Sequence, residues 1–364
     1  MEKIGIIGGG NLGMMMAEAA HRMGMQIVVL DPQPDCPCSQ FAEEQIVADF
    51  NDVKKMEELC LKTEVVTYAF ENVPYTSIKE LGLLYNIPQG EMPLFLAQHR
   101  LREKISATRA GAVCTEYIPV NNTYELIEGV RLIDYPCVLK TCNVFDYKGY
   151  VVLQGADQFP EASRIVEKSH CILEKYVPFD MEISIVVTRS IFGDITTFPI
   201  AQNINKGTHL LMSIVPASIS DEVTHKAELM AKTIMRNLGF VGTLTIEMFV
   251  LDEEVIFNEM APHPHNSGNY TIEACNVSQF EQHIRAITGL PLENTDLLHP
   301  AISVSFFGQH INGVKELEKL SLPRVFVHDY LKSDIVEDSK MGHVTFLNYS
   351  KEEVDDFVNQ YWDL

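Results

Sequence analysis

Two glutamates, Glu247 and Glu259, lie in apolar segments that are expected to form neighbouring β-strands. Glu247 interrupts the run GTLTIEMF at residues 242–249, and Glu259 interrupts VIFNEM at residues 255–260, with an acidic turn between the two runs. A carboxylate in a buried strand is costly unless a partner compensates its charge. Two facing carboxylates and the amide oxygen of Asn258 would form an oxygen cage suited to Mg²⁺ and nucleotide phosphates. The alternative is that both acids point to solvent.

Lysines at two strand ends could supply the positive charge that phosphates require. Lys140 follows the apolar residues CVL, and Lys175 follows the run CILE. A lysine at a strand end often reaches solvent, but two of them on the sheet that carries the paired acids favour an ATP cleft. In such a cleft, the segment EKYV at residues 174–177 could present backbone groups to adenine, and Glu182 could hold the ribose hydroxyls.

A polar, proline-braced loop follows Glu259 directly. Residues 261–270 read APHPHNSGNY, which has the density of hydrogen-bonding groups that a substrate site needs. An ordinary surface loop is the alternative. His263 and His265 could suggest zinc, but no further histidine or cysteine lies at a suitable spacing.

Near the N-terminus, Gly8, Gly10 and Gly13 form a G-x-G-x-x-G pattern between an expected strand and an expected helix, and Asp31 ends the next strand. Glycines let the backbone approach an anion, and a helix N-terminus supplies free N–H groups and the positive end of a dipole. The pattern matches a dinucleotide fingerprint and makes an NAD-dependent oxidoreductase an alternative hypothesis. A tight turn with no ligand is the other interpretation.

The elements that must position these residues fall into distinct regions. Residues 1 to about 90 alternate short β-rich runs with helical stretches, which predicts a parallel sheet with right-handed crossovers. A helix is expected from about 94 to 110. From about residue 135, strands at hairpin-like spacing predict an α+β region with mostly antiparallel pairs. The expected strands are 4–7, 27–30, 46–48, 65–68, 137–140, 151–153, 172–175, 182–188, 195–200, 243–250, 255–260, 302–306, 324–330 and 343–347, and the other expected helices are 12–23, 220–238 and 278–288.

Composition limits the class of protein. A chain of 364 residues is too long for one compact core and suits two or three domains. The formal charge of −22, from 50 acidic and 28 basic residues, argues against nucleic acid and anionic membranes as partners. No apolar run approaches the roughly 18 residues of a membrane span, and the first residues lack the features of a signal peptide. Eight scattered cysteines favour free thiols in a reducing compartment.

Taken in order, these motifs resemble the ATP-grasp superfamily, and within it the 5-(carboxyamino)imidazole ribonucleotide synthetases. The resemblance spans nearly the whole chain and is most specific at residues 258–289, which include PHNSG and HIRAITG. Further matching stretches are LDP at 30–32, FEN at 70–72, SQFE at 278–281 and KMGH at 340–343. The resemblance implies a mixed α/β and α+β ATP-grasp fold: a Rossmann-like pre-ATP-grasp domain at 1–95, an ATP-grasp domain at 96–294 and a small β-rich C-terminal domain at 295–364.

The same resemblance implies a reaction and a set of site residues. The expected reaction is the ATP-dependent carboxylation of 5-aminoimidazole ribonucleotide by bicarbonate in purine biosynthesis, through carboxyphosphate, with ATP and Mg²⁺ as cofactors and a cytoplasmic homodimer as the enzyme. ATP contacts carry over to Arg100, Lys140, Lys148, Glu174, Lys175, Tyr176, Val177, Glu182, Asn205 and Asn258, and metal ligation to Glu247 and Glu259. Catalytic roles carry over to Asp146, His265 and Lys340, and substrate binding to Gly10, Asn11, Leu12, Glu71, Asn266 and Ser267.

Departures from the family pattern leave the acceptor open. The family's glycine-rich phosphate loop, GGYDGKGQ, is matched here by NVFDYKGY at residues 143–150. Bulky residues resist positive φ and close backbone approach, so a stiffer loop with fewer phosphate contacts is expected. A ligase with another acceptor and a regulatory or vestigial nucleotide-binding protein are therefore alternatives. Other replaced positions are Asn11 for Gln, Ala69 for Glu, Asn205 for His, His263 for Arg and Ser339 for a basic residue.

Overall fold

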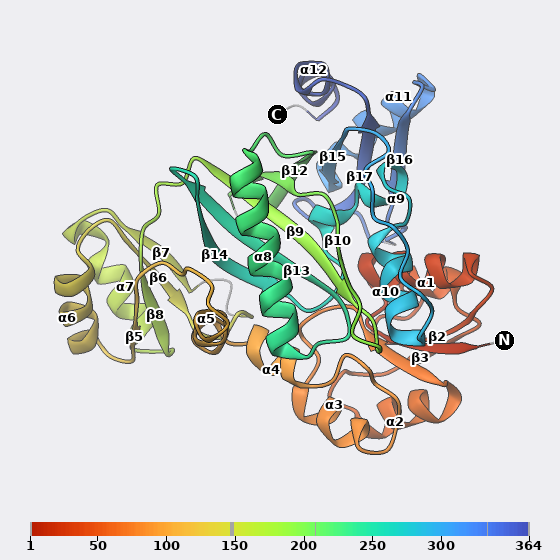
Figure 1. The fold of residues 1–364 in the computed structure, drawn as a ribbon, viewed down its shortest axis with the longest axis horizontal. Helices are drawn as coiled ribbons and strands as arrows, with labels where there is room; N and C mark the ends of the chain where they lie inside the picture. The colour runs from red at the N-terminus through yellow and green to blue at the C-terminus, as the bar shows by residue number, and fades with distance from the viewer. Residues whose placement is uncertain (1, 146–148, 208, 333, 363–364) are drawn as a thin grey trace.

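The computed structural model describes residues 2–145, 149–207, 209–332 and 334–362, and its chain begins with a four-stranded parallel sheet in the order β3-β2-β1-β4 (Figure 1). Alternating side chains of these strands enter two different cores, as the expected parallel sheet requires. Helix α1 and the distant helix α10 cover one face, and α2 and α3 cover the other. The bounds are β1 Lys3–Ile7, α1 Asn11–Arg22, β2 Gln26–Asp31, β3 Glu44–Val47, α2 Val53–Lys62, β4 Val65–Tyr68, α3 Tyr75–Gly82 and α10 Gln279–Thr288.

A second, antiparallel sheet forms a small lobe in the order β5-β8-β6-β7. Helices α6 and α7 pack on it through a compact aliphatic core, while α4 and α5 connect this lobe to the N-terminal sheet (Figure 1). Strand β5 was not expected from the sequence. The bounds are α4 Met92–Ala97, α5 Arg100–Arg109, β5 Tyr117–Val120, α6 Thr123–Ile133, β6 Cys137–Thr141, β7 Tyr150–Leu153, α7 Phe159–Val166 and β8 Cys171–Lys175.

The largest layer is a nine-stranded sheet in the order β14-β13-β9-β11-β12-β15-β17-β16, with β10 paired to β9. Its C-terminal strands extend the same sheet and do not form a separate one, because β15 pairs with β12. The expected strand at 195–200 is shorter, and β11 and β12 are additional. The bounds are β9 Met181–Arg189, β10 Ile195–Thr197, β11 Ala201–Lys206, β12 His209–Val215, β13 Gly242–Leu251, β14 Glu254–Ala261, α9 Thr271–Ala274, β15 Ala301–Phe307, α11 Ile311–Lys319, β16 Val325–Asp329, β17 Lys340–Leu347 and α12 Lys351–Tyr361.

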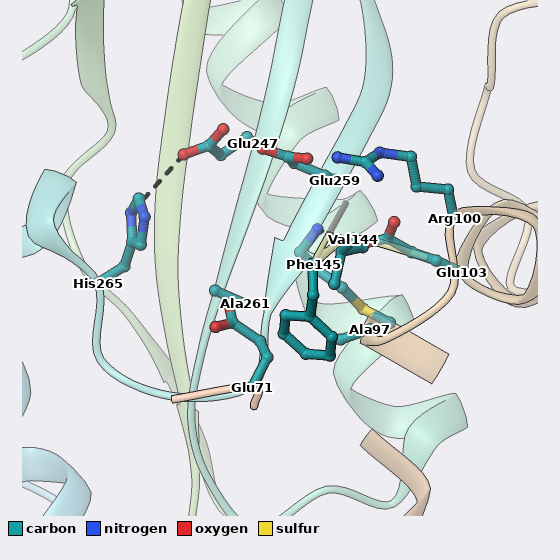
Figure 2. Close-up of a pocket in the computed structure, with 11 residues that line it drawn as sticks. Glu71, Ala97, Arg100, Glu103, Val144, Phe145, Glu247, Glu259, Ala261 and His265 are labelled. Atoms are coloured by element: carbon teal, nitrogen blue, oxygen red, sulfur yellow. Dashed lines mark hydrogen bonds and ion pairs between the residues drawn. The ribbon is translucent and has the colours of Figure 1, made fainter. Parts of the chain in front are cut away.

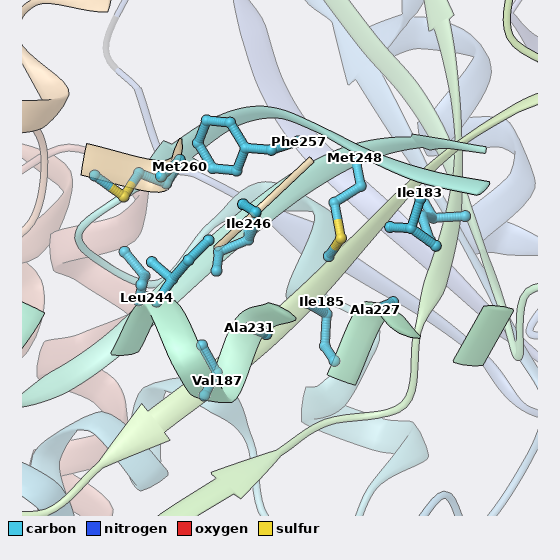
Figure 3. Packing of buried hydrophobic residues seen from close by; sticks show 14 of the residues in the cluster. Ile183, Ile185, Val187, Ala227, Ala231, Leu244, Ile246, Met248, Phe257 and Met260 are labelled. Atoms are coloured by element: carbon cyan, nitrogen blue, oxygen red, sulfur yellow. The ribbon is translucent and has the colours of Figure 1, made fainter. Parts of the chain in front are cut away.

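Helix α8 (Asp221–Leu238) packs across β9 and β13, and its inward residues include Ala227 and Ala231 (Figure 3). The Ser220 side chain caps its first turn by accepting from Val223 N, and Gly239 ends it in the left-handed conformation. Small alanines let the helix approach the sheet closely. One face of the sheet thus packs against α8 in an apolar core, and the opposite face carries polar side chains. Helices α11 and α12 cover the C-terminal end of the sheet.

The single helix expected at 94–110 is wrong, because the chain forms α4 and α5 with a break at Gln98 and His99. His99 has an extended backbone with φ −147°. Backbone N–H of Arg100 donates to the Cys142 carbonyl oxygen, and the Gln98 amide donates to two carbonyl oxygens of the N-terminal domain. These tertiary contacts override a helical pattern that is continuous in the sequence.

Candidate active site

A β-bulge shapes the carboxylate pair. Glu247 on β13 lies opposite Glu259 on β14, but the next pair is Met248 with Phe257, so Asn258 is an extra residue in β14. Bulges re-aim side chains next to functional sites. Here the neighbours on both sides of the bulge, Phe257 and Met260, are buried, whereas Asn258 and Glu259 are not.

The two acids face each other across the strands as expected, but their side chains are not enclosed in the apolar core. The Glu247 side chain is 16% exposed and Glu259 is exposed. Both face a cavity of about 200 Å³, and Figure 2 shows the guanidinium of Arg100 directed toward the same space. The lining residues are Glu71, Ala97, Arg100, Glu103, Val144, Phe145, Glu247, Glu259, Met260, Ala261 and His265.

Negative charge is concentrated in this cavity. Burial, followed by the charge of Glu259, raises the pKa of Glu247 well above its usual range. The same two causes raise the pKa of Glu103 to about 8. Clustered carboxylates repel one another, so a cation would stabilise their ionised forms. Within the described residues, no three His, Cys, Asp or Glu side chains are arranged to hold a metal unaided. A cation at Glu247 and Glu259 would thus need further oxygen ligands, which suits Mg²⁺ bound to phosphates.

Lys140 and Lys175 lie on the sheet of the small lobe and not on the sheet that carries the acids, so the expectation of one shared sheet is wrong. Lys140 on β6 donates to Glu174 Oε2 at 3.0 Å, and the buried Lys104 of α5 lies 3.5 Å from Glu174 Oε1. Burial raises the pKa of Glu174, but the two lysine charges outweigh it, and the net pKa is lowered. For Lys140, burial lowers the pKa, and the charge of Glu174 outweighs it.

Lys175 points elsewhere. Its ammonium group donates to the carbonyl oxygens of Ile133 and Asp134, at 2.8 and 3.5 Å, where α6 ends. Because adjacent residues of a strand face opposite sides, the Glu174 side chain points toward Lys104 and Lys140, and the Lys175 side chain does not.

The connection after β8 and the start of β9 carry the other expected ATP contacts. The Tyr176 N–H donates to the Pro136 carbonyl oxygen, whereas the described residues offer no acceptor for the Val177 N–H. Glu182 lies opposite Phe249 on β13, and Asn205 donates to its carboxylate at 2.9 Å. Two residues predicted to bind ATP are thus brought together although 23 positions separate them.

The loop after β14 is fixed by the buried side chain of Gln279, which accepts from the His265 N–H and donates to the His265 carbonyl oxygen. Burial, followed by the charge of His263, lowers the pKa of His265 to about 3. The neutral ring accepts from Ser267 at Nδ1, which leaves the Nε2–H free to donate. His265 Nδ1 lies 3.7 Å from Glu247 Oε1, so the loop after β14 directly adjoins the carboxylate pair.

His263 binds the N-terminal domain at this site. Its Nε2 lies 2.9 Å from Glu71 Oε1, and its Nδ1 donates to the Pro264 carbonyl oxygen at 2.7 Å. Burial lowers the pKa of His263, but the charge of Glu71 outweighs it, and the pKa is raised. For Glu71, burial raises the pKa, and His263 brings it down to about 2. The pair is therefore an ion pair near neutral pH.

The glycine-rich loop at residues 8–13 lies beside the loop after β14. Asn11 donates to Asn266 at 3.0 Å, and a Cβ on Gly10 would meet open space. By contrast, Asp31 accepts from the N–H groups of Gly9 and Gln33, so its carboxylate is already engaged. A Cβ on Gly9 would lie 2.2 Å from Cys36 Sγ.

At the C-terminal side, Lys340 begins β17. Burial, followed by the charge of Lys332, lowers the pKa of Lys340 to about 8. Its charge also lowers the pKa of His265, after the effects of burial and of His263. Leu12 packs against the core under α1. Asp146 and Lys148 lie outside the described residues.

Two site residues were missed from the sequence, Glu103 and Lys104. Glu103 lines the cavity, and Lys104 contacts Glu174. The available signal was their spacing, since positions three and four after Arg100 lie on the same face of one helix.

The chain is similar to known proteins along nearly its whole length. Three family models match: the ribonucleotide synthetase preATP-grasp domain over residues 1–98, the ATP-grasp domain over 106–280, and the phosphoribosylaminoimidazole carboxylase C-terminal domain over 302–356. The N5-carboxyaminoimidazole ribonucleotide synthase of Bacillus subtilis (strain 168) is 41% identical, over 99% of this chain and 95% of that protein.

Solved structures agree. The ADP complex of an N5-carboxyaminoimidazole ribonucleotide synthetase is 43% identical with a TM-score of 0.96, covering 100% of this chain and 97% of that one. The corresponding enzyme from Aspergillus clavatus, in complex with ADP and 5-aminoimidazole ribonucleotide, is 26% identical with a TM-score of 0.92, covering 100% and 98%.

Proposed function

Because the chain belongs to the N5-carboxyaminoimidazole ribonucleotide synthase family of ATP-grasp enzymes, we propose that it carboxylates 5-aminoimidazole ribonucleotide with bicarbonate, consuming ATP. It is thus an ATP-dependent ligase of purine biosynthesis. The observation that carries the proposal is the bulged β13–β14 pair, which presents Glu247 and Glu259 to a cavity bounded by both the small lobe and the substrate loop.

The ATP end of the site lies where the small lobe meets the central sheet. Adenine would accept from the Val177 N–H, and Glu182, held by Asn205, would bind the ribose hydroxyls. Arg100 and Lys140 would neutralise the phosphates. Charge-assisted contacts of this kind position a phosphoryl group for transfer.

We propose Mg²⁺ as the metal, held by Glu247 and Glu259 with the Asn258 amide oxygen nearby. The oxygen-rich donor set fits a hard cation, and so does the raised pKa of Glu247, which burial and then the charge of Glu259 cause. When bound, Mg²⁺ would neutralise charge on the phosphates during transfer.

The substrate end would be formed by the N-terminus of α1 and the loop after β14. Gly10 and Asn11 would present free backbone N–H groups to the ribonucleotide phosphate, with Lys340 as the cation. The free Nε2–H of neutral His265 would orient the carboxyl donor between the two ends. Glu71, Asn266 and Ser267 surround the same loop.

A cytoplasmic location and a homodimer are part of the proposal. All eight cysteines, each within the described residues, are free thiols, which supports a reducing compartment. Among the described residues, no helix has both the length and the apolar character to cross a bilayer. Light scattering of the purified protein tests the dimer, and a monomer mass would contradict it.

The direct test is ADP release from purified protein with 5-aminoimidazole ribonucleotide and bicarbonate. Glu259→Gln should reduce turnover by about 100-fold or more, since it removes one carboxylate from the proposed metal site. Glu254→Gln, a change at an exposed glutamate of the same hairpin, serves as the matched control.

Release of ADP only with other amine acceptors would favour a second candidate function, that of a ligase with a changed acceptor. The apolar side chains of Val144 and Phe145 in the cavity wall are the observation behind it.

A further inference from the structure

The two consecutive residues Glu103 and Lys104 of α5 contact β14 on both sides of its bulge. Glu103 Oε1 accepts from the Met260 N–H at 2.6 Å, and the Lys104 ammonium donates to the Phe257 carbonyl oxygen at 3.3 Å. The residues between these two anchor points are Asn258 and Glu259.

Strand β14 needs such contacts because it is the edge strand of the nine-stranded sheet. A bulge leaves its extra residue unpaired and disrupts the ladder locally, so pairing with β13 does not by itself fix Asn258, which lies between Phe257 and the paired Glu259. Backbone N–H and C=O groups on the outer side of an edge strand also lack a strand partner. The Phe257 N–H donates to the Val113 carbonyl oxygen, and side chains of α5 supply partners for the Phe257 carbonyl oxygen and the Met260 N–H.

Both α5 side chains are almost completely buried, with Glu103 3% and Lys104 2% exposed. Buried charges are costly unless they are paired and hydrogen-bonded. Lys104 additionally lies 3.5 Å from Glu174, whose other oxygen accepts from Lys140. Helix α5 therefore contacts the backbone of β14, which carries Glu259. Through Lys104 it also contacts Glu174, which binds Lys140.

We propose that Glu103 and Lys104 are positioning residues, which hold the β14 bulge so that Asn258 and Glu259 face the nucleotide-bound metal. This role rests on the proposed function and concerns the same site. The structural alternative is that the two residues only join α5 to the sheet and stabilise the fold.

The experiment measures Mn²⁺ binding in the presence of ADP, through the loss of the free Mn²⁺ electron paramagnetic resonance signal, together with thermal unfolding. Glu103→Asp keeps a carboxyl group but is one methylene too short to reach the Met260 N–H. Glu103→Gln replaces the carboxyl group with an amide but keeps an acceptor oxygen at the right distance. We expect Glu103→Asp to weaken Mn²⁺ binding by about tenfold or more, as for other groups that orient metal ligands, and Glu103→Gln to stay within about threefold of the wild type.

Lys104→Met, which keeps the apolar stem, should weaken Mn²⁺ binding and ADP binding together. The matched control is Lys226→Met, since Lys226 donates to the Glu253 carbonyl oxygen at the far end of the same hairpin. It should leave both affinities unchanged. Wild-type Mn²⁺ affinity in Glu103→Asp and Lys104→Met, or equal losses in Glu103→Asp and Glu103→Gln, would overturn the positioning role alone. A wild-type protein that binds no Mn²⁺ with ADP would overturn the metal assignment itself, and the positioning role with it.

Discussion

Lys140 and Lys175 occupy similar strand ends, but their ammonium groups contact different partners. Lys140 donates to the buried Glu174 carboxylate, whereas Lys175 donates to the carbonyl oxygens at the end of α6. Lys140→Met should therefore raise the Michaelis constant for ATP by roughly tenfold or more, because a charge-assisted contact is worth about 1.5–3 kcal/mol. Lys175→Met should leave that constant nearly unchanged and lower the free energy of unfolding by about 0.5–1.5 kcal/mol. ATP titrations and denaturant unfolding of both variants measure the difference. A large ATP effect in Lys175→Met would contradict the assignment.

The ion pair between Glu71 and His263 gives a pH prediction. The raised pKa of His263 adds stability that is fully present below its unfolded value of 6.5 and is lost as pH rises through the folded pKa. The lowered pKa of Glu71 adds stability that is present above 4.5 and is lost as pH falls toward about 2. Glu71→Gln should therefore lower the melting temperature most between about pH 4.5 and 6.5, and less outside that window. Glu80→Gln, an exposed glutamate of the same domain, is the control. An offset independent of pH would show that the pair is not ionic.

At the residue scale, sequence patterns identify the chemical role of a side chain better than they identify the direction in which it points. An acid in an apolar run stands out, so Glu247 and Glu259 were predictable. The orientation of Lys175 was not, because it depends on which face of β8 meets α6. Glu103 and Lys104 looked like ordinary surface charges of a helix, since only the folded chain brings β14 against them.

At the scale of elements, most strands were predictable because their apolar runs are short and separated by turn residues. The bulge in β14 was not, since it is defined by register against β13 and no local residue type requires it. The membership of Lys140 in a separate lobe also escaped prediction, because hairpin spacing does not reveal where one sheet ends and another begins.

The loop after β6 is the element that departs most from the family pattern. Its described start is attached to the α4–α5 connection through the pairing of Asn143 with His99, and Val144 and Phe145 line the cavity. We expect the variant Val144→Gly with Tyr147→Gly to turn over several-fold faster, because glycine allows the backbone to approach phosphate and the loop to move. Steady-state ADP release measures the effect, and Leu298→Gly in an exposed loop controls for flexibility in general. An unchanged or slower rate would mean that the bulky side chains are part of the working site.

At the scale of the molecule, the residues of the site come from all three sheets and their connections. A buried network joins the first sheet to the central one: His283 on α10 contacts Thr67 of β4 at 2.8 Å and accepts from the Thr243 N–H of β13. Gln89 extends this network by donating to the Pro262 carbonyl oxygen, next to the substrate loop. The N-terminal domain is thereby fixed to the sheet that carries Glu247 and Glu259, while Lys140, which is proposed to bind ATP, belongs to the small lobe.

A nucleotide that binds between the small lobe and the central sheet should stabilise the whole chain. At 100 times its dissociation constant, a ligand that binds only the folded state adds about 2.7 kcal/mol to the free energy of unfolding. We therefore expect ATP with Mg²⁺ to raise the melting temperature by several degrees, and 5-aminoimidazole ribonucleotide with ADP to raise it further. NAD should give no shift, because the Asp31 carboxylate already accepts from Gly9 and Gln33 and Cys36 packs against Gly9. AMP is the control for adenine alone. A shift with NAD equal to that with ATP would mean that the glycine-rich loop binds a dinucleotide after all.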